Sequence, residues 1–299
     1  MTDNKFNKQN TRVGFIGLGL MGSRFVRRLN AGGWKVRGWN RNRSATLPLK
    51  KYGFAIDNKL ADLVRESDVL LSSLANDNAV RAVYFGEDGV FANVGPGVTI
   101  LEMSTISPEL SAFLHQEARN RGADLMDLPV SGSTPAVNAG TVTLFAGGTP
   151  ETFNRCIPIF ESIAKQWFLM GPATAGIRMK LVPNLLHSVN MEAIAEAVSL
   201  GEHLELNRDL LLDVLPKTVI APAFLGKITK IKAGDYSTQF PLHLMSKDMS
   251  LVHGAAKESG AELPAAEVTE LMFENAVAKN GDLDLSAITP YVLSSRRTK

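Results

Sequence analysis

Val13-Gly14-Phe15-Ile16-Gly17-Leu18-Gly19-Leu20-Met21-Gly22 is an apolar run that passes through spaced glycines into a helical pattern. Such a run predicts a buried parallel strand, and the spacing G-x-G-x-x-G is typical of the turn from a strand into a dinucleotide-binding helix. Gly17 permits the tight turn, Gly19 lets the backbone approach a pyrophosphate, and Gly22 lets helix and strand pack closely. The phosphates would lie over the free N–H groups of the helix N-terminus, where the helix dipole favours anions.

The next apolar run, at residues 35–39, follows after about one helix length, as a βαβ unit requires. A structural glycine turn is the alternative, because glycines gather in tight turns of any kind. The context on both sides favours dinucleotide binding. We therefore expect cofactor contacts from the whole turn, namely Gly17, Leu18, Gly19, Leu20, Met21 and Gly22.

The residues that follow the second run indicate which dinucleotide binds. A unit that binds NAD usually carries Asp or Glu at this point, where it accepts hydrogen bonds from the ribose hydroxyls. This chain has Asn40-Arg41-Asn42-Arg43 instead. No carboxylate repels a 2′-phosphate there, two guanidiniums can pair with one, and Arg41 can also stack on the adenine. We therefore expect NADP(H) rather than NAD(H), with contacts from Asn40, Arg41, Asn42 and Arg43; a solvated basic loop is the alternative.

Length and composition restrict the class of protein. With 299 residues and 45% hydrophobic content, the chain can bury a large core and is expected to form two domains. The net charge of +2 predicts no binding to nucleic acid or to an anionic membrane, and no apolar run is long enough to predict a membrane span. The single cysteine, Cys156, excludes an intramolecular disulfide and predicts a cytoplasmic protein with a buried structural thiol. Residues 1–11 are polar, lack the apolar segment of a signal peptide, and predict a disordered lead-in.

Apolar runs alternate with helix-length segments through the first half of the chain. This alternation predicts an α/β domain over residues 12–172, a Rossmann-like doubly wound sheet with helices on both faces. Beyond it the pattern is helical, beginning with a long periodic stretch at 175–203, in which Pro183 either introduces a kink or lies in the first turns. We therefore expect an all-α domain over 173–299, joined to the sheet by the long helix, with ligands bound in the cleft between the domains. Further strands are expected at 69–74, 98–103, 124–127, 141–146 and 167–170, and further helices at 209–219, 240–259 and 265–280.

Four segments outside the glycine turn carry polar groups suited to chemistry. Met103-Ser104-Thr105-Ile106-Ser107-Pro108 and Asp127-Leu128-Pro129-Val130-Ser131-Gly132-Ser133 each leave a strand, which places hydroxyl and N–H groups at the carboxyl edge of the sheet. Ordinary turn chemistry is the alternative for both. Lys180 and Asn184 share one face of the long helix, and the apolar neighbours of Lys180 disfavour a solvated surface lysine. The last segment, Met245-Ser246-Lys247-Asp248-Met249, places a charged pair in an apolar helical pattern.

Together these segments resemble the β-hydroxyacid dehydrogenase family, which includes 3-hydroxyisobutyrate dehydrogenase and the tartronate, glyoxylate and succinic semialdehyde reductases. The similarity extends from about residue 12 to residue 278, in matching order and spacing. It implies a Rossmann-like domain followed by an all-α domain, usually assembled as a homodimer or homotetramer. It also implies the roles of the matching residues: Lys180 as the catalytic acid/base, Asn184 orienting substrate, Ser131, Gly132 and Ser133 binding the substrate carboxylate, Lys247 closing over the cofactor, Thr105 beside the nicotinamide, and Leu74 and Ala75 as further cofactor contacts.

The chain departs from the family pattern at three positions. Thr174 stands where the fuller G-x-G-x-x-x-K pattern has its first glycine, and Pro183 stands where K-x-x-N-N has its first asparagine. Both changes are expected to affect the start of the helix and the shape of the substrate pocket. The third, Ser133 in place of the second glycine of V-S-G-G, resembles the glyoxylate/succinic semialdehyde reductase branch, which uses NADPH.

The expected reaction is hydride transfer from NADPH to the aldehyde of a short oxo-acid, which gives the hydroxy acid. Lys180 as an ammonium would stabilise the alkoxide and donate the proton, and partial burial would lower its pKa. No metal site is expected, because the five histidines lack ligand spacing; His187 is expected to be a core or partly solvated residue. Two alternatives stay open. One is an NAD-linked 3-hydroxyisobutyrate-type dehydrogenase, and the other is a non-catalytic NADP-binding sensor or interaction protein, which the presence of Lys180 and Asn184 disfavours.

Overall fold

A computed structural model describes residues 5–51, 53–218, 230–231, 233–238, 241–243, 245–246, 249, 257 and 260–294. The chain divides into a first unit, Met1–Asn184, and a second unit, Leu185–Lys299. The domain boundary expected at residue 172 stays a prediction.

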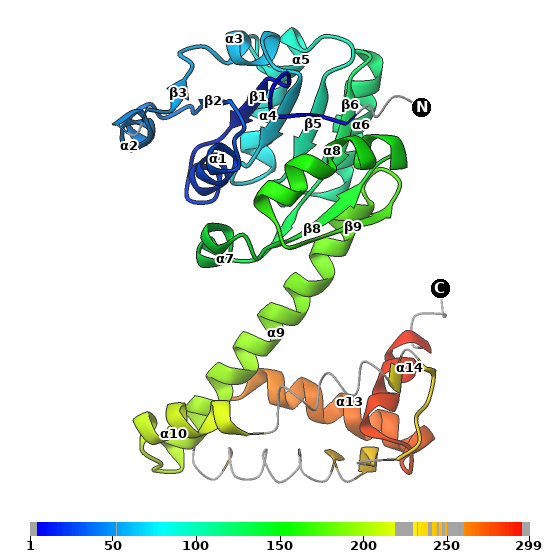
Figure 1. The fold of residues 1–299 in the computed structure, drawn as a ribbon. Helices are drawn as coiled ribbons and strands as arrows, with labels where there is room; N and C mark the ends of the chain where they lie inside the picture. Colours follow the sequence, from blue (N-terminus) through cyan, green and yellow to red (C-terminus); the bar gives the residue numbers. More distant parts are fainter. Residues whose placement is uncertain are drawn as a thin grey trace. The chain divides into compact units, whose positions relative to one another are not determined.

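The first unit is built on a nine-stranded sheet (Figure 1). Its strands are β1 (Val13–Ile16), β2 (Val36–Trp39), β3 (Ala55–Ile56), β4 (Val69–Ser72), β5 (Thr99–Glu102), β6 (Asp124–Asp127), β7 (Val130–Ser131), β8 (Thr143–Gly147) and β9 (Gln166–Gly171). They lie in the order β3-β2-β1-β4-β5-β6-β8-β7, with β9 paired to β8. The pairs from β3 to β6 are parallel, whereas β8 runs antiparallel to β6 and β7 and parallel to β9. The order reverses between β1 and β4, which is the kind of switch point where open α/β sheets bind ligands.

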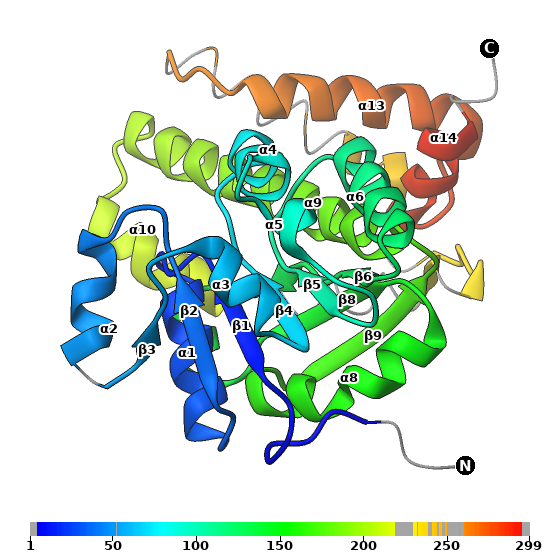
Figure 2. The ribbon, with the colours of Figure 1, turned by 90° about the horizontal axis from the view of Figure 1, so that it is seen from above.

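Helices cover both faces of this sheet (Figure 2). They are α1 (Gly22–Ala31), α2 (Leu47–Lys51), α3 (Leu60–Arg65), α4 (Asp77–Phe85), α5 (Val90–Asn93), α6 (Pro108–Asn120), α7 (Thr134–Ala139) and α8 (Pro150–Ile163), with a 3₁₀ turn, η1 (Ser44–Thr46). Helices α1 and α8 contribute Phe25 and Phe160 to one buried cluster, and α3 and α6 contribute Leu63 and Leu114 to another. The two clusters belong to the two faces of the sheet, and the expected doubly wound α/β architecture is confirmed.

Burial explains the sequence pattern of the central strands. Every residue of β1, β4 and β5 is buried, because a strand covered on both faces is a continuous apolar run rather than an alternating one. Helices α6 and α8 begin at prolines that follow Ser107 and Thr149, whose side-chain oxygens accept from the N–H groups of Leu110 and Thr152. Such capping is typical of helix N-termini and explains why these helices begin there.

Residues 5–11 contact other parts of the first unit. The Phe6 N–H donates to the carbonyl oxygen of Arg155 (3.1 Å), and the Arg155 guanidinium lies 5.3 Å from the centre of the Phe6 ring. Thr11 is buried, and its hydroxyl oxygen accepts from the Asn7 N–H (3.0 Å). One aromatic side chain thus anchors the otherwise polar stretch over residues 5–11, and the disordered lead-in expected over residues 1–11 stays a prediction.

Cys156 is buried in α8, and burial raises the pKa of its thiol to about 12. A thiol that stays protonated and inaccessible is inert toward oxidation and metal binding. The expected structural role of Cys156 is confirmed.

The second unit is mainly helical in its described part. Its elements are α9 (Ala175–His203), which begins in the first unit, α10 (Arg208–Val214), η2 (Leu215–Lys217), α13 (Pro264–Asn280), η3 (Leu285–Ala287) and α14 (Ile288–Ser294). Helix α9 has the bounds that its periodicity predicts, and Pro183 lies inside it rather than in its first turn. The helix expected at 240–259 falls largely outside the described residues. Among the described helices, none combines the length and the apolar character that a membrane span requires.

Candidate active site

The glycine turn between β1 and α1 has the geometry of a phosphate-binding loop. Gly17 has φ +90°, and a Cβ there would meet the carbonyl oxygen of Ser73. A Cβ on Gly22 would meet the carbonyl oxygen of Gly17, whereas a Cβ on Gly19 would have nothing within 4 Å. Gly17 and Gly22 are therefore required by the packing of the protein itself, and Gly19 leaves open space that a pyrophosphate can enter.

The start of α1 has unpaired backbone donors. Among the hydrogen bonds of the described residues, none has the N–H of Gly19, Leu20 or Met21 as its donor. The N-cap residue, Met21, makes no side-chain capping bond, and the first turn holds no acidic residue. Free N–H groups at a helix N-terminus bind phosphate, so the residues present fit the pyrophosphate of a dinucleotide.

Two asparagines shape the loop that follows β2. The Asn40 Oδ1 accepts from the Leu18 N–H (2.9 Å), and the Asn40 Nδ2 donates to the carbonyl oxygen of Asn42 (2.7 Å). The Asn42 Oδ1 accepts from the N–H (3.0 Å) and the hydroxyl (2.7 Å) of Ser44. Both side chains thus stabilise the loop, and Asn40 also ties it to the glycine turn, a role that sequence reasoning missed.

The two arginines of this loop are exposed. The Arg43 Nη2 donates to the carbonyl oxygen of Asn58 (3.3 Å). The Arg41 side chain takes part in no hydrogen bond or ion pair of the described part of the chain. Its guanidinium is therefore free to pair with an anionic ligand.

Residues from distant segments line one cavity of about 350 Å³ within the first unit. They come from the start of α1, from the first turns of α9, from the segments that follow β4 and β5, and from β7 and the residue after it. Of the expected site residues, the cavity brings together Met21, Leu74, Ala75, Thr105, Gly132, Lys180 and Asn184. Ser131 and Ser133 flank Gly132 and do not line the cavity. Its place at the carboxyl ends of the parallel strands is where open α/β sheets bind ligands.

Lys180 is half-buried, and burial lowers the pKa of its ammonium. Among the described residues that line the cavity, Lys180 alone carries a charge. Asn184 follows it one helical turn later, on the same face of α9. An amine with a lowered pKa exchanges its proton closer to neutral pH than an ordinary lysine, which suits acid/base chemistry.

The loop after β7 holds the residues expected to bind a carboxylate. Ser131 pairs with Thr143 of β8 at the end of β7. Gly132 has φ +146°, and a Cβ there would lie 2.8 Å from the Val142 Cγ1. Ser133 is the N-cap of α7, and its hydroxyl makes no capping hydrogen bond. Position 132 therefore requires glycine, and the Ser133 hydroxyl is not used to cap α7.

Thr174, which stands at a glycine position of the family pattern, has a left-handed backbone with φ 73°. This conformation is costly for a β-branched residue and costs glycine little, which explains the glycine of the pattern. The Thr174 N–H donates to the Asp127 Oδ1 (2.9 Å), and α9 begins at the next residue. Thr174, at the glycine position, therefore keeps a strained backbone conformation just before α9 begins.

A buried carboxyl group, Glu102 at the end of β5, connects the strand ends near the cavity. The Ser72 hydroxyl donates to the Glu102 Oε2, and the Ser104 N–H donates to the Oε1 (2.7 Å). The Ser104 Oγ accepts from the Leu74 N–H (2.7 Å), and the Tyr84 hydroxyl lies 2.7 Å from that of Ser72. Burial raises the pKa of Glu102. In the sequence, the only sign of this hydrogen-bond network is a glutamate within an otherwise apolar strand.

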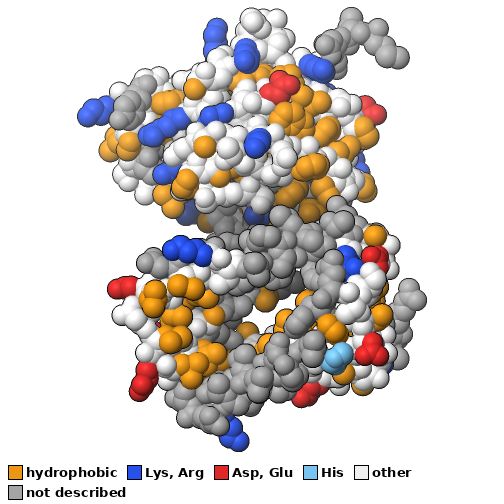
Figure 3. Space-filling model, turned by 60° about the horizontal axis from the view of Figure 1, so that its bottom comes forward, with side chains coloured by type: hydrophobic (Ala, Val, Ile, Leu, Met, Phe, Trp, Pro, Cys, Tyr) orange, Lys and Arg blue, Asp and Glu red, His pale blue; other side chains and the backbone are white. Residues whose placement is uncertain are grey.

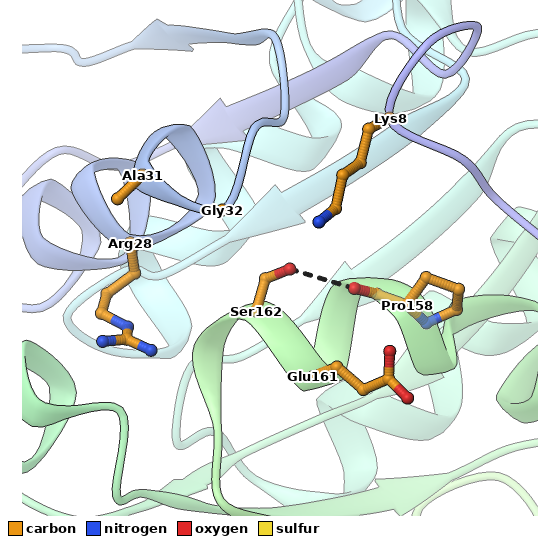
Figure 4. Close-up of a pocket in the computed structure, with 7 residues that line it drawn as sticks. All are labelled: Lys8, Arg28, Ala31, Gly32, Pro158, Glu161 and Ser162. Atoms are coloured by element: carbon orange, nitrogen blue, oxygen red, sulfur yellow. Dashed lines mark hydrogen bonds between the residues drawn. The ribbon is translucent and has the colours of Figure 1, made fainter.

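A second hollow, of about 380 Å³, lies between the N-terminal segment, the end of α1 and α8 (Figure 4). Lys8 and Arg28 line it together with the acidic Glu161. The Ser162 hydroxyl in this hollow donates to the carbonyl oxygen of Pro158 (3.1 Å). None of the expected site residues lines it, and its lining carries charges of both signs, whereas the cavity that contains Lys180 brings seven of the expected residues together.

Two expected residues cannot be placed in this site. Lys247 lies outside the described residues, as does the side chain of His187, and both expectations stay predictions. Within the described ranges, no group of three or more His, Cys, Asp or Glu side chains could hold a metal ion.

Two family models match the chain. The model described as the NAD binding domain of 6-phosphogluconate dehydrogenase matches residues 12–171. The model described as NAD-binding of NADP-dependent 3-hydroxyisobutyrate dehydrogenase matches residues 174–292. The first range contains the glycine turn, and the second contains Lys180 and Asn184.

Three individual proteins show similarity over most of the chain. The chain is 31% identical over 286 residues to glyoxylate/succinic semialdehyde reductase 1 of Arabidopsis thaliana, which covers 95% of this chain and 99% of that protein. It is 33% identical over 261 residues to NAD-dependent L-serine dehydrogenase of Pseudomonas aeruginosa, which covers 85% and 88%. The solved structure of 3-hydroxyisobutyrate dehydrogenase from Salmonella typhimurium is 27% identical, with a TM-score of 0.66 over 94% of this chain and 100% of that chain.

Proposed function

Since this chain belongs to the β-hydroxyacid dehydrogenase family, we propose that it is an NADPH-dependent reductase that converts the aldehyde of a short oxo-acid to the hydroxy acid. Membership of the family makes it an oxidoreductase with a nicotinamide cofactor. The observation that carries the proposal is the cavity in which Met21 of the glycine turn meets Lys180 and Asn184. The similarity to glyoxylate/succinic semialdehyde reductase 1 favours substrates of that type.

The proposed mechanism uses the groups of this cavity. When bound, NADPH supplies the hydride that reduces the aldehyde carbon. Lys180, as an ammonium, stabilises the negative charge that develops on the carbonyl oxygen and donates its proton to that oxygen. In the opposite direction the neutral amine accepts the proton of the hydroxy acid. Asn184 orients the reacting oxygen, and the N–H of Gly132, which lines the cavity, binds the substrate carboxylate. The hydroxyl groups of Ser131 and Ser133, which flank Gly132 without lining the cavity, are expected to reach the carboxylate once substrate is bound.

The proposed preference for NADPH depends on the loop after β2. No carboxylate stands there to repel a 2′-phosphate, and the exposed guanidiniums of Arg41 and Arg43 can pair with it. The Asn40 side chain already bonds the Leu18 N–H and the Asn42 carbonyl, so the two arginines carry most of the selection. The similarity to an NAD-dependent L-serine dehydrogenase makes NAD-linked oxidation of a 3-hydroxy acid the second candidate function.

One set of assays separates these functions. NADPH or NADH oxidation is followed by absorbance with glyoxylate, succinic semialdehyde, tartronate semialdehyde and methylmalonate semialdehyde. NAD⁺ reduction is followed with L-serine and 3-hydroxyisobutyrate. We expect the highest kcat/KM with NADPH and either glyoxylate or succinic semialdehyde. Faster NAD⁺ reduction would favour the second candidate, and NADPH binding without any turnover would favour the non-catalytic alternative.

We further propose that the protein is a cytoplasmic homodimer or homotetramer. Apolar side chains are exposed on and near α10 and α13, including Leu206, Leu210, Val268 and Leu271, which are 54% to 64% exposed. Figure 3 shows that exposed hydrophobic side chains gather on one face of the molecule. Clusters of exposed apolar residues are typical of protein–protein contacts. Light scattering on the eluting protein tests this, because a monomer would have the chain mass of 32.4 kDa. The cytoplasmic location rests on the single cysteine and is tested by fractionation of the source cells.

A further inference from the structure

Asp127, the last residue of β6, is buried and accepts hydrogen bonds from the start of α9. Its Oδ1 accepts from the Thr174 N–H (2.9 Å), and its Oδ2 accepts from the Ile177 N–H (2.7 Å). His115 of α6 is also buried, and its Nε2 lies 2.8 Å from the Asp127 Oδ1. Asp127 thus pairs two donors of the kind that a helix start leaves without an intrahelical partner.

The first turn of α9 also packs closely on the strand ends. A Cβ on Gly176 would lie 2.7 Å from the Asp127 carbonyl oxygen and 2.8 Å from the Gly147 nitrogen. A Cβ on Gly147 would in turn lie 2.7 Å from the Gly176 nitrogen. The negative carboxylate is favourable at the positive end of the helix dipole. The position of this turn is therefore determined by contacts with β6 and β8, and Lys180 follows Ile177 by about one helical turn.

We propose that Asp127, oriented by His115, is a positioning residue that determines where α9 holds the Lys180 amine in the cavity. The inference rests on the proposed function, in which Lys180 is the acid/base. Neither Asp127 nor His115 lines the cavity, so both act through the helix and not on the substrate. A reacting group displaced by about 1 Å can lose about 10²-fold in rate. Loss of one contact to the helix start is therefore expected to slow the chemical step.

Asp127→Asn tests the proposal with almost no change in side-chain volume. An amide has one acceptor oxygen, so the N–H of either Thr174 or Ile177 would face an NH₂ group. Asp124→Asn is the matched control, because Asp124 lies on the same strand, pairs with Arg155 and is 47% exposed. His115→Gln and His115→Phe form a second pair, in which only the first keeps a hydrogen-bonding group.

Single-turnover kinetics with excess enzyme separate positioning from loss of folded protein. The rate constant reports the chemical step, and the amplitude reports the amount of active enzyme. We expect the rate constant for aldehyde reduction to fall at least about 10-fold in Asp127→Asn, with the Kd for NADPH within about 2-fold of wild type. Asp124→Asn should match wild type, and His115→Gln should retain more of the rate than His115→Phe. An unchanged rate constant with a reduced amplitude would show a purely structural role and overturn the proposal.

Two further readouts need no turnover. Hydrogen exchange should be at least about 10-fold faster in Asp127→Asn for one of the two amides, Thr174 or Ile177, because one of these N–H groups loses its acceptor. The pH midpoint for acylation of Lys180, followed by mass spectrometry, should rise toward that of an ordinary lysine as the ammonium gains solvent. If the wild type reduces none of the aldehydes, the proposed function fails, and these readouts still decide whether Asp127 holds Lys180. Unchanged exchange and an unchanged midpoint would overturn the positioning role.

Discussion

Replacing Gly19 with alanine separates what the cofactor requires from what the fold requires, and Gly22→Ala is the matched control. The Cβ added by Gly19→Ala has nothing within 4 Å, so the protein without ligand should keep its stability. The Cβ added by Gly22→Ala meets the Gly17 carbonyl oxygen and lies 2.9 Å from the Phe15 Cε1. Helix α1 must then move away from β1, with or without a ligand.

The magnitudes follow from these contacts. Overpacking of a well-packed site costs about 1–3 kcal/mol, and about 2 kcal/mol lowers the Tm of a chain of this size by roughly 3 °C. We expect that loss for Gly22→Ala and a Tm within about 1 °C of wild type for Gly19→Ala. A methyl group in the open space above the turn should remove at least one N–H contact to a phosphate oxygen. A hydrogen bond to a charged group contributes about 1.5–3 kcal/mol, so the Kd of Gly19→Ala for NADPH should rise roughly 10- to 150-fold.

Thermal melts with and without NADPH, together with calorimetric titration, measure both quantities. Because a ligand stabilises the folded state by mass action, Gly19→Ala should melt like wild type alone and gain less from NADPH. Wild-type affinity in Gly19→Ala would refute the assignment of this space to the pyrophosphate. A Tm as low as that of Gly22→Ala would refute the geometric argument about the turn.

Three further predictions concern the reaction and the cofactor. Lys180→Ala should lower kcat about 10³-fold or more while NADPH still binds, because Lys180 supplies both the proton and charge stabilisation. Lys165→Ala, at an exposed lysine, is the control. Near-normal turnover in Lys180→Ala would remove Lys180 from the mechanism. Burial lowers the pKa of Lys180, and reduction needs the ammonium, so kcat/KM for reduction should fall as pH rises through that lowered pKa. Oxidation should rise over the same range, and a pH profile that stays flat up to the ordinary lysine pKa of about 10.4 would contradict this. Two arginine contacts to the 2′-phosphate, together about 2–3 kcal/mol, should give NADPH roughly a 30- to 150-fold advantage in kcat/KM. Arg41→Ala should remove most of this advantage by raising the KM for NADPH, and equal use of NADH and NADPH by the wild type would refute it.

Local patterns in the sequence predicted the elements that carry the site. The glycine turn is one case, because the positive φ of Gly17 and the contact between Gly22 and the Gly17 carbonyl oxygen both arise within a single strand-to-helix connection. Helix α9 is another, because the helical pattern expected over 175–203 matches its bounds, Ala175–His203, and Pro183 does not end it. In both cases neighbours in the chain are also neighbours in space, so spacing alone carries the information.

Such local patterns could not predict contacts between segments that are distant in the chain. Asp127 was grouped with the loop that follows it, while its partners Thr174 and Ile177 lie 47 and 50 residues away. The cofactor contact expected of Asn40 stays a prediction, and spacing gave no sign that its Oδ1 accepts from the Leu18 N–H of a different element. The antiparallel pairing of β8 with β6 had no local signal either, since strand direction depends on how the chain returns to the sheet. Side-chain direction and pairing are properties of tertiary structure, and spacing cannot supply them.

Cys156 makes this chain convenient for site-specific labelling. It is the single cysteine of the sequence, it is buried, and the pKa of its thiol is about 12. Maleimide reagents react with the accessible thiolate, so at neutral pH the native protein should stay unlabelled. A cysteine introduced at the surface would then be the only reactive position, with no need to remove a native one.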